Sequence, residues 1–442
     1  MTAESLRSDA LRIWHAGLAA VKPGPMVRAA IEALPASIRA EIAAAPHIQV
    51  VGCGKAGAGM AAALEEVLAP QLDRIVGLVN VPEGVASTTR KIRLHPARPA
   101  GVNFPTAAGV TGAEEMLALL ADAGADDVAI CLISGGSSAL LPAPVAGVSL
   151  EDKQAVTKLL HASGASIGEM NAVRKHLSRV KGGRLAEAFH GKRLLGLIVS
   201  DVVGDPLDVI ASGPTAPDPT TFADALAVLN QYQLRSRAPA SVVAHLERGA
   251  AGEITETPKS LPASMRNIII GGNAIALAAA RREAETLGYR VLDLGPFIEG
   301  ETQVVASTMM GIVRNIRERS QPLAAPVCIL IGGETTVSLG TSTGKGGRNQ
   351  EFVLAALANL NMNSMANVAV LSAGTDGEDG PTDAAGAIAT IETIQAAAAL
   401  GLNAHDFLAH HDAYPFFDAT GGLIRTGLTD TNVTDVRVIL IR

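Results

Sequence analysis

The chain has 442 residues, with 36 Lys and Arg against 43 Asp and Glu, and its formal net charge of −7 excludes the broad basic surface of a dedicated nucleic-acid-binding protein. Hydrophobic residues make up 48% and charged residues 18%, which excludes a mainly disordered chain and leaves room for about two to three globular domains. Glycine is enriched, at 45 residues, whereas aromatic residues make up only 3%. We therefore expect close packing of small residues and many loops lined by backbone.

The sequence indicates neither a disulfide framework nor a secretory leader. The cysteines are few and widely spaced, and we expect them to be reduced and buried. They are Cys53, Cys131 and Cys328. The N-terminus carries Glu4, Arg7 and Asp9 in place of an apolar leader. The uncharged run 128–150 is long enough to span a membrane, but its glycines and prolines indicate strand, turn and loop. We expect a soluble cytoplasmic protein with no nucleic-acid or membrane partner.

The first predicted element is an amphipathic helix at residues 5–21, which we interpret as a packing helix. After it, apolar runs rich in Val and Ile repeatedly end in glycine-rich turns, and Ala- and Leu-rich stretches usually follow. These runs cover residues 47–51, 128–133, 195–199, 267–270, 327–331 and 368–371. Continuous apolar strands that alternate with helices predict an α/β fold with a parallel sheet covered on both faces, and such sheets bind ligands at the carboxyl ends of their strands.

One polar segment suggests a domain boundary. Residues 247–264 contain two prolines and show no hydrophobic period, so we predict a linker there. It divides the chain into an N-terminal domain, residues 1–248, and a C-terminal domain, residues 266–442.

The first glycine-rich turn, residues 52–57, reads GCGKAG and fits the G-x-G-x-x-G spacing between a strand and a helix. Backbone N–H groups and the helix dipole at such a turn favour an anion, and Lys55 adds a positive charge that suits a phosphate. A dinucleotide site would need an acid at the end of the next strand for the ribose, but residues 75–80 end without one. Ligand binding is the favoured interpretation, and a tight turn that packs helix on strand is the alternative.

Two loops that follow predicted strands carry clusters of acids. Asp201 and Asp205 lie in the first loop, and Asp376, Asp379 and Asp383 lie in the second. Carboxylates at strand ends beside phosphate-type loops are what a magnesium ion and a general base require. Aspartate is also common in glycine-rich turns, but two separate sets at strand ends favour a functional role.

Two further stretches concentrate positive charge. Residues 341–348, TSTGKGGR, resemble a phosphate loop, although the Walker A spacing is one residue short and Gly346 replaces the Ser or Thr that would hold magnesium. Lys345 and Arg348 would be its cations, and a surface loop with two solvated cations is an equal alternative. Residues 171–176, NAVRKH, are followed by residues 181–184, KGGR, and this basic stretch suits recognition of a carboxylate or phosphate. A solvated helix face is favoured on spacing alone.

These segments together resemble the class II glycerate 2-kinase family, the MOFRL proteins. The similarity covers nearly the whole chain in the family's order, and the stretches GGRNQE and GTDGEDGPTDAAGA are long and unusual. The matching segments are VVGCGKAGAGM (50–60), LISGGSSALLP (132–142), NAVRKHLSRVKGGRLA (171–186), SDVVGDPLDVIASGPTAPDPTTFADA (200–225), GGETTVSL (332–339), GKGGRNQEF (344–352) and SAGTDGEDGPTDAAGA (372–387).

The resemblance implies an enzyme that transfers the γ-phosphoryl group of ATP to the 2-hydroxyl of D-glycerate with a divalent metal, taken here as Mg²⁺. It also implies a larger Rossmann-like N-terminal domain, a smaller α/β C-terminal domain, and an active site in the cleft between them. Lys55 and Arg348 match functional positions of the family, and Asp201 or Asp376 would hold metal or accept the hydroxyl proton. The expected partners are these two small molecules, and a homo-oligomer is left open.

The candidate site residues fall into three groups. The catalytic candidates are Lys55, Arg348, Asp201 and Asp376. The candidates for binding substrate and nucleotide are Gly52, Gly54, Ser134, Gly135, Gly136, Ser137, Asn171, Arg174, Lys175, Gly332, Gly333, Glu334, Thr335, Gly347, Asn349 and Glu351. The metal-binding candidates are Asp201, Asp205 and Asp376.

Two segments depart from the family pattern, and two rival functions stay open. His411 begins an HDAY segment where the family reads NDSY, and Leu428 and Asp430 replace Pro and Gly in the family's TGPTGTNVND segment. The first rival is an NAD(P)H-dependent hydroxypyruvate reductase, which the G-x-G-x-x-G turn favours and the missing ribose acid opposes. The second is a non-catalytic sensor of a nucleotide or sugar acid.

Overall fold

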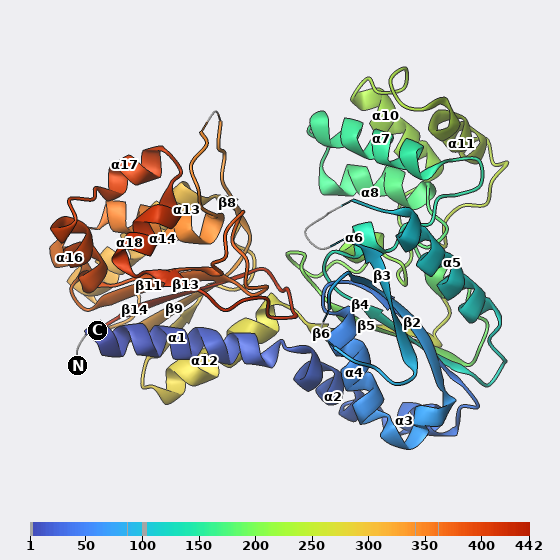
Figure 1. The fold of residues 1–442 in the computed structure, drawn as a ribbon, viewed down its shortest axis with the longest axis horizontal. Helices are drawn as coiled ribbons and strands as arrows, with labels where there is room; N and C mark the ends of the chain where they lie inside the picture. Colours follow the sequence, from blue (N-terminus) through green and yellow to red (C-terminus); the bar gives the residue numbers. More distant parts are fainter. Residues whose placement is uncertain (1–2, 86, 100–103, 341, 361) are drawn as a thin grey trace. The chain divides into compact units, whose positions relative to one another are not determined.

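The structure is a computed structural model that describes residues 3–85, 87–99, 104–340, 342–360 and 362–442. It divides the chain into two units (Figure 1). We call residues 23–270 the first-sheet unit, and residues 1–22 with 271–442 the second-sheet unit. This division differs from the predicted domains, because the chain passes from one unit to the other after residues 22 and 270 and not within the predicted linker 247–264.

The first helix, α1 (Ala3–Ala20), belongs to the second-sheet unit although it was predicted to lie in a domain of residues 1–248. It packs on α12 (Asn273–Thr286) and on two strands of the second sheet. The fully buried Trp14 donates its indole N–H to the carbonyl oxygen of Ala373 at 3.4 Å. An amphipathic stripe therefore correctly predicts that a helix is buried, but it does not name the sheet that buries it.

The predicted linker is an ordered part of the first-sheet unit. Glu256 accepts a hydrogen bond from the backbone of Phe222 at 2.8 Å, and the buried Thr257 donates to Asp218 at 2.9 Å. Its polar residues thus satisfy buried groups of this unit, which explains why polarity without periodicity was a misleading sign of a linker.

The first-sheet unit has a six-stranded sheet in the order β3-β2-β1-β4-β5-β6, and the pairs from β3 to β5 are parallel. The strands are β1 (Ile48–Cys53), β2 (Ile75–Pro82), β3 (Ile92–Arg98), β4 (Val128–Ile133), β5 (Arg193–Val199) and β6 (Met265–Gly271). The order 3-2-1-4-5-6 is that of a Rossmann fold, so the predicted Rossmann-like parallel sheet is confirmed for this unit.

Helices cover both faces of this sheet. Side chains alternate along a strand, so Leu78 joins the core on the side of α5 while the neighbouring Val79 lies against Gly57 of α4 on the opposite face. The helices and turns of helix are α2 (Pro23–Glu32), α3 (Ala36–Ala44), α4 (Gly57–Val67), η1 (Ala69–Arg74), α5 (Ala107–Ala121), α6 (Ser137–Leu140), α7 (Leu150–Ala162), α8 (Ile167–His176), α9 (Arg184–Glu187), η2 (Ile210–Ser212), α10 (Phe222–Gln231) and α11 (Ala240–Ala250).

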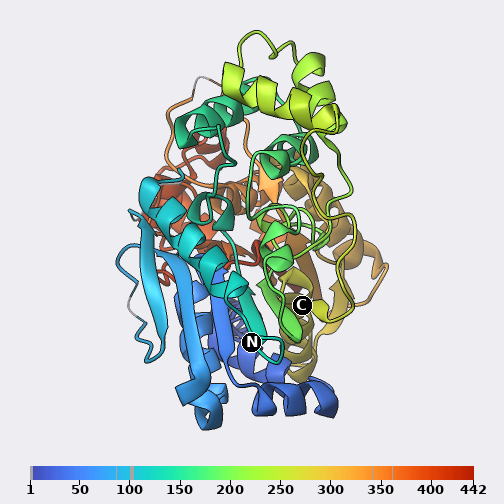
Figure 2. The same cartoon turned by 90° about the vertical axis from the view of Figure 1, so that its right-hand side faces the viewer.

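Two features of this unit position the candidate site. The strand order reverses between β1 and β4, and ligands of open parallel sheets bind outside the carboxyl ends of the strands at such a switch point. The short helix α6 begins at the carboxyl end of β4, and α7, α8, α10 and α11 form a separate helical layer next to it (Figures 1 and 2). That layer has its own apolar core, which includes Leu160 of α7 and Phe222 of α10.

The second-sheet unit also has a six-stranded sheet, in the order β13-β12-β11-β14-β9-β7, but its strands are mixed in direction. The strands of this unit are β7 (Arg290–Asp293), β8 (Gly300–Glu301), β9 (Val327–Gly333), β10 (Thr335–Thr336), β11 (Val368–Gly374), β12 (Gly386–Ala389), β13 (Leu423–Ile424) and β14 (Asp435–Ile441). Among the described strands of this sheet, β7 and β9 pair in parallel and the other neighbours pair antiparallel.

The prediction of a parallel sheet was therefore wrong for this unit. The C-terminal strand β14 lies between β9 and β11, antiparallel to both, and all three strands are buried along their whole length. A strand buried on both faces reads as a continuous apolar run whichever way it points, so burial pattern alone could not give the direction. The remaining helices are α13 (Thr302–Arg319), α14 (Arg348–Asn359), α15 (Met362–Met365), α16 (Ile391–Ala399), α17 (Ala404–Ala409) and α18 (Ala413–Thr420).

A helix that crosses a bilayer needs about 20 consecutive, mostly apolar residues. Among the described residues, none of the helices combines the length and apolar character needed to cross a membrane.

Candidate functional site

Two glycine-rich turns of the first-sheet unit meet at the switch point between β1 and β4. The backbone N–H of Lys55 donates to the carbonyl oxygen of Gly135 at 2.9 Å, and the N–H of Ala56 donates to Ser134 Oγ at 3.1 Å. In return, Ser137 Oγ donates to the carbonyl oxygen of Cys53 at 2.9 Å. The turns are therefore locked to each other by their own polar groups.

This interlocking changes the interpretation of the G-x-G-x-x-G turn. A Cβ atom at Gly52 would lie 2.3 Å from the carbonyl oxygen of Leu132, and one at Gly54, whose φ is +133°, would lie 2.0 Å from Ser134 Oγ. The N–H groups of residues 54–57 all donate to acceptors within the protein. Both glycines thus have a packing role that lets the two turns touch, and a direct ligand role for them stays a prediction.

The side chain of Lys55 is the charged group of this turn. Its Cγ lies 3.4 Å from the position that a Cβ atom on Gly136 would occupy, and Arg98 approaches the same position to 3.8 Å. Gly136 has a φ of +81° and precedes α6. Two basic side chains therefore flank the turn at the carboxyl end of β4, and an anion site at this turn stays a prediction.

The end of β2 bears on the reductase alternative. Asn80 occupies the region where a dinucleotide site would place an acid, and it is completely buried. Its Nδ2 donates to the carbonyl oxygens of Gly109 at 3.1 Å and of Leu140 at 2.7 Å. This amide ties α5 and α6 to the sheet, which disfavours a ribose-binding role.

The three candidates of the NAVRKH segment on α8 have different surroundings. The ammonium of Lys175 is buried between Asp208 and Asp218, at 3.2 and 3.1 Å, and Asn171 accepts a hydrogen bond from Ser212 at 2.9 Å. These contacts indicate structural roles. Arg174 differs, because it lines a cavity between α6, α7 and α8.

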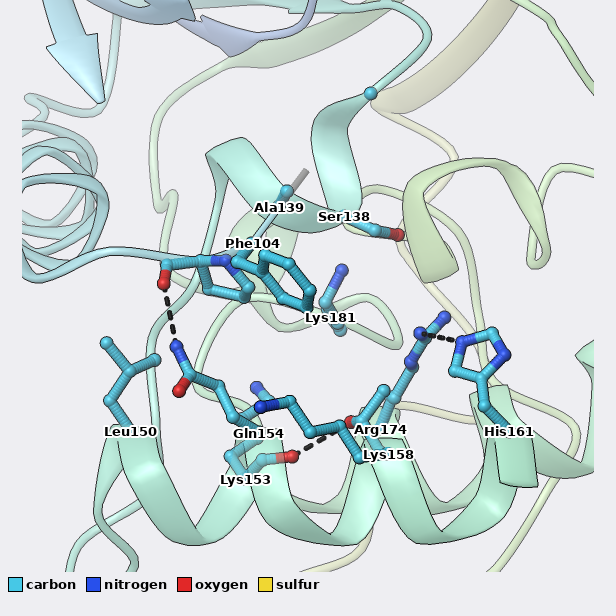
Figure 3. Close-up of a pocket in the computed structure, with 13 residues that line it drawn as sticks. Phe104, Ser138, Ala139, Leu150, Lys153, Gln154, Lys158, His161, Arg174 and Lys181 are labelled. Atoms are coloured by element: carbon cyan, nitrogen blue, oxygen red, sulfur yellow. Dashed lines mark hydrogen bonds between the residues drawn. The ribbon is translucent and has the colours of Figure 1, made fainter. Parts of the chain in front are cut away.

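This cavity has a volume of about 320 Å³, at the lower end of the range for small-molecule sites. Its polar lining includes four cations and, among the described residues, no carboxylate (Figure 3). The cations are Lys153, Lys158, Arg174 and Lys181. Gly136 also lines it, so the cavity adjoins the turn that Lys55 contacts. Sequence reasoning selected Arg174 and placed Lys181 in the same basic stretch, but it missed Lys153, Lys158 and Phe104.

The cavity should make the stability of the protein depend on pH in a definite direction. Burial, reinforced by Arg174, lowers the pKa of Lys181 from 10.5 to about 7. Between these values the unfolded chain binds more protons than the folded chain, so the free energy of unfolding rises with pH, by up to about 1.4 kcal/mol per pH unit for one lysine. We expect the melting temperature to increase from pH 7 to pH 8.5, and Lys181→Met to make this increase smaller in calorimetry. An equal slope in the variant would contradict the assignment.

The predicted metal ligands do not form a ready-made site. Asp201 and Asp205 follow β5 in the first-sheet unit, whereas Asp376 follows β11 in the second-sheet unit and accepts a hydrogen bond from the N–H of Glu378. Among the described residues, no three His, Cys, Asp or Glu side chains lie close enough together to hold a metal ion. Their residue types suit magnesium, but the geometry assigns none of them to it.

The second catalytic candidate, Arg348, begins α14 in the second-sheet unit and is held by two carboxylates. It makes a bidentate pair with the fully buried Asp435, at 2.8 and 3.1 Å, and its NH1 lies 2.8 Å from Glu334. Burial alone would lower the pKa of Arg348, but pairing with Asp435 raises this pKa. The buried Arg437 also donates to Asp435, at 3.0 Å, and to the predicted ligand Thr335, at 2.9 Å.

The start of α14 is occupied by a carboxylate of the protein itself. Asp379 accepts hydrogen bonds from the N–H of Asn349 at 3.0 Å and of Gln350 at 2.9 Å, and a Cβ atom on Gly347 would lie 2.3 Å from its carboxyl carbon. These N–H groups at the start of the helix, which could otherwise meet a bound anion, are therefore already satisfied. The capping carboxylate takes the place that a phosphate would fill.

The loop before α14 and the turn after β9 are also engaged internally. The N–H of Lys345 donates to Asp412 at 2.8 Å, and its ammonium lies 3.9 Å from the ring centre of Tyr414. Thr341 lies outside the described residues. Cβ atoms on Gly332 and Gly333 would lie 1.6 Å from Asn273 and 2.2 Å from the carbonyl oxygen of Ile298, so these glycines allow close packing. The described residues of both segments are therefore held by contacts within the protein.

One departure from the family pattern has a clear structural partner. His411 lies 2.9 Å from Glu351, which is buried and also accepts a hydrogen bond from Gln303. Glu351 was predicted to bind ligand, but its contacts indicate that it holds the segment containing His411 against α14. Leu428, by contrast, is 72% exposed, and Asp430 has a φ of +59°.

Comparison with known proteins adds an independent observation. A domain of unknown function, DUF4147, matches residues 9–247, and the MOFRL family matches residues 327–435. A protein named glycerate 2-kinase from Pyrococcus horikoshii is 38% identical over 398 residues, which cover 89% of this chain and 87% of that protein. A putative hydroxypyruvate reductase from Agrobacterium vitis is 40% identical over 397 residues, covering 89% and 86%.

A solved structure shares the fold. The crystal structure of a glycerate kinase from Thermotoga maritima matches with a TM-score of 0.86 and 34% identity, over 99% of this chain and 100% of that one. The similarity therefore extends over both sheets and all the segments discussed above.

Proposed function

Because the chain belongs to the glycerate 2-kinase (MOFRL) family, we propose that it transfers the γ-phosphoryl group of ATP to the 2-hydroxyl of D-glycerate, giving 2-phosphoglycerate. The observation that carries the proposal is the placement of Lys55 at the switch point of a Rossmann-type sheet, against Gly136, which also lines a cavity with four cations and, among its described lining residues, no carboxylate. Such a positively charged region favours the binding of anionic substrates.

Phosphoryl transfer depends mainly on positioning and on neutralising charge. Lys55 would supply positive charge to the transferring phosphoryl group, and the rigid turn that carries it would fix its position, since the turn is tied by hydrogen bonds to the turn after β4. When bound, magnesium would neutralise charge on the ATP phosphates. We assign no residue of this chain as its ligand, and Asp201 stays a candidate for accepting the hydroxyl proton.

One assay separates this proposal from its two alternatives. We expect ADP to form when the protein is mixed with ATP, magnesium and D-glycerate, and ³¹P NMR to identify the product as the 2-phosphate. L-Glycerate serves as the stereochemical control. Oxidation of NADH or NADPH with hydroxypyruvate, without ADP formation, would overturn the proposal in favour of the reductase. Binding of ATP and glycerate without turnover of either kind would indicate a sensor, and a 3-phosphate product would overturn the proposed regiochemistry.

A further inference from the structure

The cavity between α6, α7 and α8 has the features of a site for a polyanion. In Figure 3, Phe104 and Leu150 lie toward one end, Arg174 and His161 lie at the other, and the lysines point in between. Arg174 is 3.4 Å from His161, and Lys158 lies 5.5 Å from the ring centre of Phe104. The site thus combines an apolar end with basic side chains from α7, α8 and the segment that follows α8.

Lys153 is the most telling of these side chains. It projects from the first turn of α7, is 7% exposed, and its ammonium nitrogen has no hydrogen-bond partner among the described residues. Lys181, which is 2% exposed, donates to the carbonyl oxygen of Ala211 at 2.9 Å and retains two further donors. A buried amine without an acceptor is costly for folding, so a ligand that supplies the acceptor is the economical explanation for it.

We propose that this cavity binds the polyphosphate chain of the nucleotide substrate and that Lys153 is one of the residues that bind it. The inference rests on the proposed function for the identity of the nucleotide. Charge decides between the two anionic substrates, because four cations exceed what the single carboxylate of glycerate needs and match a triphosphate. The apolar end, which includes Phe104, would accept part of the nucleoside.

Burial of these lysines also couples anion binding in the cavity to the uptake of protons. Burial, together with Lys181, Arg174 and Arg184, lowers the pKa of Lys153 well below its ordinary value. The other charged or titratable groups facing it are Lys158 and His161 of α7. A bound polyphosphate favours the protonated amines, so binding takes up protons and weakens as the pH rises above about 7, the pKa of Lys181.

Titration calorimetry with inorganic tripolyphosphate tests this without requiring turnover. We expect Lys153→Met to weaken tripolyphosphate and ADP binding by about tenfold or more, since a charge-assisted hydrogen bond is lost. Lys192→Met, which removes an exposed lysine paired with Asp126, is the matched control for the loss of one charge and should bind as the wild type does. Wild-type protein should take up protons on binding at pH 8, measured as a dependence of the binding enthalpy on the buffer.

Stability separates a binding role from a structural role. If Lys153 served the fold, Lys153→Met would lower the melting temperature, whereas we expect the ligand-free variant to melt above the wild type because the methyl thioether needs no acceptor. If Lys153→Met does not fold, the expected gain in stability is wrong. Lys153→Gln then tests whether this residue contributes to tripolyphosphate and ADP binding. Unchanged tripolyphosphate and ADP affinities would overturn the proposal, as would a loss confined to D-glycerate. Lys153-dependent tripolyphosphate binding without kinase activity would leave the site standing and overturn the proposed function.

Discussion

Replacing Lys55 with methionine is expected to lower kcat for ADP formation by about two to three orders of magnitude, the cost of removing one group that stabilises charge in a transition state. The reason is its position. Lys55 lies where β1 ends, its stem follows Gly136, and Gly136 borders the cationic cavity. Methionine keeps the unbranched stem that packs on this turn and removes only the charge. The hydrogen bond from the N–H of Lys55 to Gly135 is made by the backbone and is retained.

The folded state should hardly change in this variant. Lys55 is only partly buried and its contribution to packing is kept, so we expect the free energy of unfolding to stay within about 0.5 kcal/mol of the wild type. Lys192→Met is again the matched control and should retain full activity. Steady-state kinetics at saturating ATP and D-glycerate measure the effect. A Lys55→Met enzyme with more than a tenth of the wild-type kcat would remove Lys55 from the proposed mechanism.

The strands of both sheets could be predicted from the sequence because their cores are continuous apolar runs. β1, β4, β9 and β11 begin within one residue of the predicted positions. Their directions were not predictable in the second sheet, since the antiparallel β14 is as fully buried as its parallel-running neighbours. The reversal depends on where a late segment of chain returns, which no local pattern encodes.

The turn that carries Lys55 was predictable from the sequence, whereas its contacts were not. The spacing of residues 52–57 correctly marked a turn at a strand end, but Ser134 and Gly135, distant in sequence, use the N–H groups expected to meet a phosphate. Lys153 lies in the sequence LEDKQAVTK, which has the appearance of an ordinary exposed helix with mixed charges. Only the three-dimensional structure, in which α7 packs on α8 and lines the cavity, shows that this lysine is buried.

Replacing Arg348 with alanine is expected to destabilise the protein by about 3 kcal/mol, in addition to reducing activity. The variant leaves the fully buried Asp435 without its bidentate partner, and breaking a buried pair on one side typically costs about 3 to 5 kcal/mol. The low end of this range applies because Arg437 still donates to Asp435 at 3.0 Å. The family resemblance alone would lead one to expect a purely catalytic residue, so this loss of stability is the result that the structure adds.

Arg425→Ala is the matched control for that experiment. Arg425 also pairs with two carboxylates, Asp383 and Asp418, at 3.1 and 2.7 Å, but all three side chains are well exposed, so its removal should cost at most about 1 kcal/mol. Urea unfolding followed by the fluorescence of the single Trp14, which lies in the same unit as both arginines, compares the two variants directly. Activity should be assayed without urea, at a temperature at which circular dichroism shows Arg348→Ala to be folded.

A lysine at position 348 would keep the charge without the bidentate geometry. Because the ion pair holds α14 to β14, we expect Arg348→Lys to recover only part of the stability. If Arg348→Ala and Arg425→Ala unfold at the same urea concentration, the ion pair with Asp435 does not support the fold, and Arg348 keeps only the catalytic role predicted from its motif.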